Sequence, residues 1–272
     1  MLDGTCSGLY SVEGFGPGFR VRHVESAMPK GNVDLTSILS AARNISPKEQ
    51  AWWQDAYEDE DERTPFASSL DRLEREPPKK LDDILKLCGR GRPDDVQPWH
   101  LALLARASAV TTPAKIKLSA KAAFVVGSLH LRGPLQLKGP LVVTGDLTVD
   151  GPIIDVIEKW LLLAVGGSLK AHAVASSQHV LVGGDCTVRD FIWGFEAHCP
   201  FVVRGKVKTP LVVWTDYRPS KLGDASGVRE VLDNPDQADL ERHFDAKLLG
   251  DCTIKQKAMV MRLVAGKPVG PK

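Results

Sequence analysis

Apolar and polar residues alternate in a pattern that recurs five times in the middle of the chain. Aligned on Gly127, Gly145, Gly167, Gly184 and Gly205, the repeats are spaced by 18, 22, 17 and 21 residues. The positions four and two before each glycine, and two and four after it, are apolar in nineteen of twenty cases. The positions one and three after it are all polar, namely Ser128, His130, Asp146, Thr148, Ser168, Lys170, Asp185, Thr187, Lys206 and Lys208. This period is typical of β-strands, which point successive side chains to opposite faces.

Repetition at one fixed offset predicts stacked coils of strand. Each coil of such a stack buries its inward row only against the coils above and below it, so every coil needs the same inward set. An antiparallel sandwich also alternates, but it has no reason to repeat one bend every 17–22 residues. We interpret the glycines as corners, where a side chain would obstruct the bend. The predicted fold is mainly β with flanking α, a single-stranded β-solenoid of about five coils between Ala114 and Tyr217.

A second apolar row falls three residues before each glycine, on the outward side of the strands. It consists of Phe124, Val142, Ala164, Leu181 and Val202. Because large exposed apolar patches mark interaction surfaces, this stripe needs a cover. Helices from the flanking segments are the favoured cover, and a second copy of the chain, giving a homodimer, is the alternative.

The flanks of the repeat have helical patterns. Ser46 followed by Pro47 is a plausible helix start, and Gly266 a plausible helix end. The predicted helices include the segments 67–76, 81–88, 96–108, 236–248 and 253–265. The chain therefore divides into a mostly helical N-terminal cap region (1–112), the solenoid (113–219) and a C-terminal helical segment (220–272). Such helices are candidates to close the open ends of a solenoid. We interpret the phrase GDCTI at Gly250 as a coincidental sixth match.

The composition is that of an ordinary globular protein, with 43% hydrophobic residues and a net charge of +1. The charge is uneven, since residues 1–100 carry a net −5 and the remainder a net +6. The five cysteines form no CxxC pair, and we see neither a signal peptide nor an apolar run long enough for a membrane span. These features predict a cytoplasmic protein that binds neither membranes nor nucleic acid directly.

No motif in the sequence indicates catalysis. The seven histidines lack metal-ligand spacing, so surface or locally paired histidines are the favoured interpretation. Cys186 falls on an inward position, as a small core residue does. Asp146 and Asp185 hold equivalent positions two coils apart, with Ser168 between them, which does not suit a pair of catalytic carboxylates. We therefore expect no enzyme activity, no cofactor and no metal.

Two segments are candidates for partner binding. The first, DAYEDEDER, packs six carboxylates into residues 55–63 directly after two tryptophans. It reads either as a solvated helix face or loop, or as an acidic surface with aromatic anchors for a basic partner. One of the tryptophans can equally be a core residue. The candidate residues are Trp52, Trp53, Glu58, Asp59, Glu60, Asp61 and Glu62.

The second candidate is the set of segments that join one coil to the next. FIWGFEAHCP and WTDYRPS are rich in aromatic and charged residues, which inert loops lack. They either cover the end of the core or form a binding edge. The candidate residues are Trp193, Phe195, Glu196, Trp214, Asp216, Tyr217 and Arg218.

With GDLTVDG, VGGDCTVRD and WTDYRP aligned, the chain resembles bactofilin-like bacterial β-solenoid proteins over residues Ala114 to Arg218. Bactofilins are scaffolds that polymerise end to end through uncapped solenoids. This chain adds about 110 residues before the repeat and about 50 after it, additions that we expect to block such growth.

In overall layout the chain is also similar to immunity proteins of polymorphic or type VI secretion toxin systems. That resemblance implies a non-catalytic inhibitor that binds a cognate protein toxin in the producing cell and covers its active site. If the toxin is a nuclease, the acidic segment could occupy its basic groove as a phosphate mimic. A structural scaffold of bactofilin type is the alternative function.

Overall fold

The computed structural model describes residues 35–56, 65–87, 96–108, 123–155, 161–195, 200–215, 221–251 and 253–271. The helices are α1 (Leu35–Arg43), α2 (Pro47–Ala56), α3 (Phe66–Arg75), the 3₁₀ helix η2 (Leu81–Leu87), α4 (Pro98–Ala107), α5 (Gln237–His243), the 3₁₀ helix η3 (Ala246–Leu248) and α6 (Gln256–Val264). The strands are β1 (Ala123–Val125), β2 (Leu129–Arg132), β3 (Leu135–Gln136), β4 (Leu141–Val143), β5 (Leu147–Asp150), β6 (Ile153–Asp155), β7 (Leu162–Val165), β8 (Leu169–Ser176), β9 (His179–Val182), β10 (Cys186–Phe195), β11 (Phe201–Thr215) and β12 (Leu222–Asp233).

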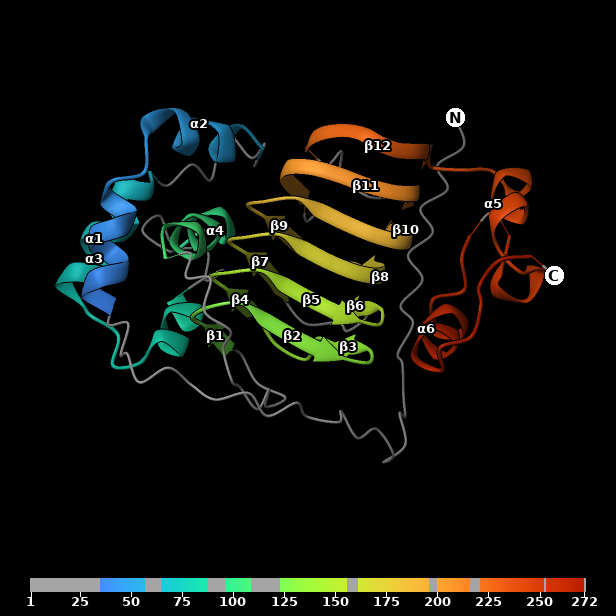
Figure 1. Ribbon diagram of the computed structural model, residues 1–272, viewed down its shortest axis with the longest axis horizontal. Coiled ribbons are helices and arrows are strands. Elements are labelled where there is room, and N and C mark those ends of the chain that lie inside the picture. Colours follow the sequence, from blue (N-terminus) through green and yellow to red (C-terminus); the bar gives the residue numbers. More distant parts are fainter. Residues whose placement is uncertain are drawn as a thin grey trace, which may run out of the picture.

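The strands wind into a parallel β-solenoid of about five turns, which confirms the predicted fold class. Every pair between these strands is parallel, and the repeats pair in the predicted register, for example Leu129 with Leu147 and Leu147 with Leu169. The stack is drawn from bottom to top in Figure 1. The regular vertical pairing means that equivalent residues of successive coils lie above one another, about 4.8 Å apart.

Each coil contributes to three faces, which we name by their surroundings. The N-covered face comprises β1, β4, β7, β9 and residues 201–203 of β11. The open face comprises β2, β5 and residues 169–171 of β8, 186–188 of β10 and 206–209 of β11. The C-covered face comprises β3, β6 and the later parts of β8, β10 and β11.

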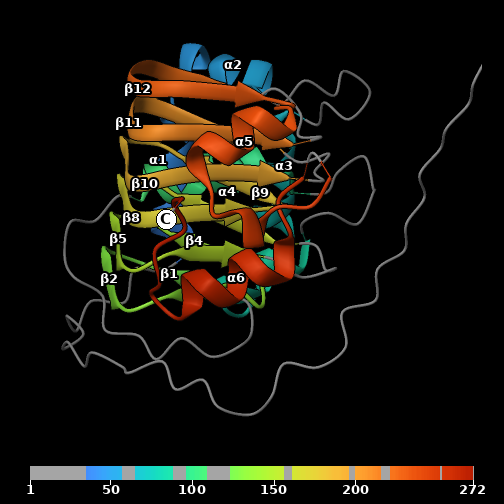
Figure 2. The same ribbon diagram turned by 90° about the vertical axis from the view of Figure 1, so that its right-hand side faces the viewer.

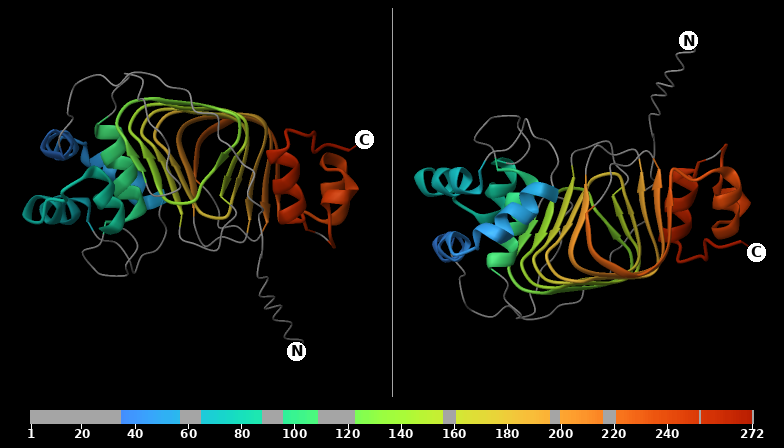
Figure 3. Two further views of the ribbon diagram at one scale, coloured as in Figure 1. Left: turned by 90° about the horizontal axis from the view of Figure 1, so that it is seen from below. Right: turned by 90° about the horizontal axis from the view of Figure 1, so that it is seen from above.

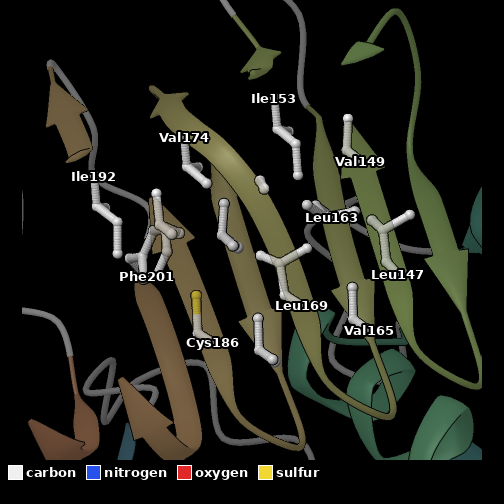
Figure 4. Close-up of a cluster of buried hydrophobic side chains, with 14 of the residues drawn as sticks. Leu147, Val149, Ile153, Leu163, Val165, Leu169, Val174, Cys186, Ile192 and Phe201 are labelled. Carbon is white, nitrogen blue, oxygen red and sulfur yellow. The ribbon is translucent and has the colours of Figure 1, made fainter. Parts of the chain in front are cut away.

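The inward residues of all three faces form one apolar interior. Leu147, Leu169 and Cys186 come from three successive coils, and with Val165 they are all fully buried (Figure 4). This interior is what the sequence pattern encoded, because the nineteen apolar positions are the inward ones. Burial of apolar surface at about 25 cal/mol per Å² is the main force that holds the coils together.

Four of the five aligned glycines, Gly127, Gly145, Gly167 and Gly184, lie at bends between strands as predicted, whereas Gly205 lies within β11. Of the five aligned glycines, Gly127 alone has a positive φ, at 106°. At Gly145 an added Cβ would lie 2.5 Å from Ser128 Oγ, and at Gly184 it would lie 2.8 Å from Ser168 Oγ. The Ser or Asp after each of the first four glycines thus occupies the space beside the glycine of the next coil and accepts a hydrogen bond from the backbone of that coil. Those bonds include Asp146 N–H to Ser128 Oγ at 2.9 Å, Ser168 N–H to Asp146 Oδ1 at 2.7 Å and Lys206 N–H to Asp185 Oδ1 at 2.9 Å.

The solenoid continues beyond its predicted end. The segment 220–272 was expected to be helical, but β12 occupies residues 222–233 and pairs in parallel with β11. Gly223, followed by Asp224, stands 18 residues after Gly205 and is the true further repeat, whereas Gly250 lies among the C-terminal helices. The strand escaped prediction because most of its residues are exposed, so it lacks an apolar run.

The flanking helices cover sides of the solenoid and not its ends. The helix α2 begins at Pro47 as predicted, with Glu49 N–H donating to Ser46 Oγ at 3.3 Å. Seen along the solenoid, the N-terminal helices and the C-terminal helices lie on two opposite sides of the strands (Figure 3). The expectation that these helices would act as end caps is therefore wrong.

Candidate binding surface

The N-covered face carries the outward apolar stripe, and the N-terminal helices bury it. Val142, Leu181 and Val202 are fully buried in one cluster with residues of α1 to α4, while Phe124 is 7% exposed. The helix α4 lies directly against β4, β7 and β9. The prediction that helices cover this stripe is confirmed, which leaves it unavailable as a dimer surface.

Trp53 belongs to this same buried cluster and is fully buried. Its proposed role as a partner-binding anchor is therefore wrong, and the alternative of a core tryptophan is correct. The adjacent Trp52 is half-buried, with Lys221 Nζ 5.1 Å and the Arg204 guanidinium 6.0 Å from its ring centre. Its ring thus interacts with cations of its own chain, which tie α2 to the last coils.

A second prediction, on the aromatic residues of β10, is wrong at the C-covered face. Trp193 and Phe195 were expected in a connecting loop, but they are outward residues of β10 and are 1% and 2% exposed. They stack at 4.1 Å between ring centres and belong to a cluster that includes Phe244 and Met259 of the C-terminal segment. Their alternation with the inward Ile192 is the sequence signal that could have placed them on a strand.

Trp214 lies on β11 and points into the solenoid, 7% exposed, with its ring 5.8 Å from that of Phe201. Its assignment to a binding edge is also wrong. The other sequence candidates lie outside the described residues, namely Glu58, Asp59, Glu60, Asp61, Glu62, Glu196, Asp216, Tyr217 and Arg218.

The open face is the one face of the solenoid over which no described helix lies (Figure 1, Figure 2). Its outward residues stack in a central column in which basic residues and threonines alternate. This column consists of His130, Thr148, Lys170, Thr187 and Lys208. The basic members are exposed and the threonines are half-buried. These positions are polar in the sequence pattern, but the pattern alone does not identify them as one surface.

Two ion pairs on the open face involve His130 of the central column and Arg189 beside that column. His130 Nε2 lies 2.9 Å from Asp150 Oδ2, and Arg189 pairs with the neighbouring Asp190 at 2.8 Å. Lys170 and Lys208 lie two coils apart, a separation of about 10 Å given the spacing of strands. The face is therefore a flat, regular array of hydrogen-bonding groups in which spaced lysines lie beside exposed carboxylates, namely Asp146, Asp150 and Asp185. Such a surface suits a polar partner whose charges match this arrangement.

Three buried ionisable groups lie at different places in the solenoid, Asp155 at the end of β6, His179 at the start of β9 and Cys186 at the start of β10. Burial raises the pKa of the Asp155 carboxyl to about 7, although Ser176 Oγ and Ser177 N–H donate hydrogen bonds to it. Burial also lowers the pKa of His179 to about 4 and raises that of the Cys186 thiol to about 12. The buried thiol is thus held in its protonated, unreactive form.

The described residues contain neither a metal-ligand cluster nor a membrane-spanning helix. No group of three or more His, Cys, Asp or Glu in that part of the chain could hold a metal ion. None of the described helices is both long and apolar enough to cross a bilayer. His100 is locally paired, with its Nδ1 2.8 Å from Ser69 Oγ.

Comparison with known proteins gives no relative for this chain. No family model, no curated protein and no solved structure matches it.

Proposed function

We propose that the chain is a non-catalytic binding protein, an immunity protein that holds a cognate secreted toxin through the open face and blocks it sterically. The observation that carries this proposal is the contrast among the faces. Two faces are buried under helices, while the third, over which no described helix lies, presents a column of His130, Lys170 and Lys208 separated by threonines. A rigid surface of this kind binds with little loss of conformational freedom, which favours tight association.

The charge of the open face indicates the partner's contact surface. Exposed lysines at regular spacing favour acidic groups on the toxin, which would increase the association rate and the specificity. This contact is separate from the acidic segment at residues 58–62, whose role as a phosphate mimic stays a prediction. Replacing its carboxylates with Ser tests that role independently.

The direct experiment is to express the product of the neighbouring gene with and without this protein. We expect that product to kill cells when expressed alone and to be harmless when this protein is co-expressed. A neighbouring product that is harmless by itself would contradict the proposal for that gene pair.

The binding surface is then tested by the double variant Lys170→Glu/Lys208→Glu. We expect at least a tenfold weaker complex by calorimetry, since two charges facing the partner change sign. The matched control is Lys257→Glu, an exposed lysine on α6. If both variants bound the toxin equally well, the open face would not be the binding surface. The proposal that the protein inhibits the toxin would be unaffected by that result.

One feature favours a second candidate, a bactofilin-type structural scaffold. The last strand, β12, leaves an edge of the solenoid unpaired among the described strands, and strand edges support self-association. Negative-stain images separate the two candidates, because a scaffold forms filaments and an immunity protein forms discrete particles.

A further inference from the structure

The interior of the solenoid is open at its last coil. Strand β12 pairs with β11 and with no other described strand. Val231 is in register with Val212, which is fully buried, yet Val231 itself is 51% exposed. Leu222 and Val228 pack against the same interior and are only partly buried. An inward row without a further coil above it is an incomplete core.

The first coil differs from the last. Its inward residues Leu129, Leu135 and Leu137 are 3%, 7% and 3% exposed and Leu131 is partly buried, and none of them is as exposed as Val231. The last coil is thus the more exposed end of the interior. A contact that uses the exposed end of both copies is complete with two copies, whereas a filament needs contacts at both ends.

The exposed side of β12 is complementary to the same side of β12 in a second copy of the chain. Arg229, Val231 and Asp233 alternate along the strand, so they share one side, and all three are exposed. In an antiparallel pair centred on Val231, this valine faces the partner's Val231, and Arg229 faces the partner's Asp233. Cross-strand pairs of apolar residues and of opposite charges both stabilise a sheet.

The other side of β12 is already occupied within the chain. Leu232 is buried against the C-terminal helices, and Glu230 lies 3.5 Å from Arg242 and 3.2 Å from His243. These contacts fix the strand against the C-terminal helices. Seen from above, the helices flank the strands at this end, and the last coil is visible between them (Figure 3).

We propose that a second copy of the chain docks on this end, with the two β12 strands antiparallel about Val231, to form a closed two-fold dimer. The pairing satisfies the backbone N–H and C=O groups along the edge and extends the apolar interior from one copy into the next. The dimer surface is therefore the end of the solenoid, and not the apolar stripe, which lies under helices.

Light scattering on the full chain tests the proposal. At about 100 µM we expect twice the chain mass of 29.6 kDa. Val231→Asp should give a monomer, because it places two carboxylates face to face on the two-fold axis. The matched control is Met261→Asp on α6, where the native side chain is 58% exposed, and it should remain a dimer.

A charge exchange tests the antiparallel register. Arg229→Asp and Asp233→Arg should each weaken the dimer at least about tenfold, and the two together should restore it because the pairs reform with reversed sign. Far-UV circular dichroism verifies that each variant is folded. A monomeric wild type, larger assemblies, or a double variant no stronger than the single ones would overturn the proposal.

Discussion

The fourth coil, which contains Gly184, keeps the same alternation of inward and outward residues on all three faces. The surroundings of its outward residues, however, differ from face to face. Its outward residue on the N-covered face is Leu181, on the open face Thr187 and on the C-covered face Trp193. Leu181 and Trp193 are 0% and 1% exposed under helices, whereas Thr187 has no helix over it in the described part of the chain. The inward residues are apolar on all three faces, so they specify the coil. The outward residues differ with the surroundings of each face, apolar or aromatic under helices and polar on the open face.

The largest expected loss of stability comes from replacing a buried apolar residue of a covered face with a charged one. Leu181→Asp should destabilise the fold by more than about 4 kcal/mol, because it buries an unpaired charge between the strands and α4. Thr187→Asp, on the same coil, should change the free energy of unfolding by no more than about 0.5 kcal/mol. Urea denaturation measures both. Similar losses for the two variants would mean that the faces do not differ as described.

The next effect concerns the buried carboxyl of the C-covered face. Because the pKa of Asp155 rises from 3.8 to about 7 on folding, its protonated form favours the folded state. That stabilisation is complete below about pH 4 and is lost as the pH rises through 7, by at most about 4 kcal/mol. Asp155→Asn keeps the shape and removes the titration, so it should become more stable than the wild type as the pH increases.

Measuring both proteins at pH 4, 6 and 8 isolates the contribution of Asp155. His179 acts in the opposite direction, since its lowered pKa of about 4 means that stability is lost as the pH falls below 6.5. Its contribution is common to both proteins and cancels in their difference. A difference that does not vary with pH would contradict the assignment.

A smaller loss of stability is expected at Gly205, where the backbones of two successive coils are in close contact. Gly205→Ala would bring a Cβ to 2.5 Å from the backbone oxygen of Gly184. The coils must separate to relieve this contact, at a cost of about 1–3 kcal/mol. Thermal unfolding checks it, and an unchanged transition temperature would show that the corner tolerates a side chain.

The smallest predicted effect distinguishes two residues of the open face. Asp185→Ala should cost about 1 kcal/mol, since it removes the acceptor of the Lys206 N–H bond. Thr187→Ala, two residues away, should cost less than about 0.5 kcal/mol. Equal costs would indicate that the side-chain ladder does not join the coils.

The repeat was predictable because one inward set recurs at a fixed offset. The stripe at Leu181 was predictable for the same reason, since its outward apolar residues required a cover. Strand β12 was not, because an edge coil needs few apolar residues. Trp193 was misplaced because aromatic side chains were taken as loop anchors, while their alternation with Ile192 indicated a strand.

The open face escaped recognition for a different physical reason. Polar residues on a strand look the same in sequence whether they face solvent alone or face a partner. Lys170 and Lys208 form a surface only once their coils are stacked and the other two faces are seen to be covered.

Lysine acetylation, measured by mass spectrometry with and without the product of the neighbouring gene, tests the binding face most directly. The proposed contact predicts that Lys170 and Lys208 react several-fold more slowly in the complex, while Lys257 on α6 reacts at an unchanged rate. Unchanged reactivity at Lys170 and Lys208 in a complex that forms would contradict the assignment of the open face.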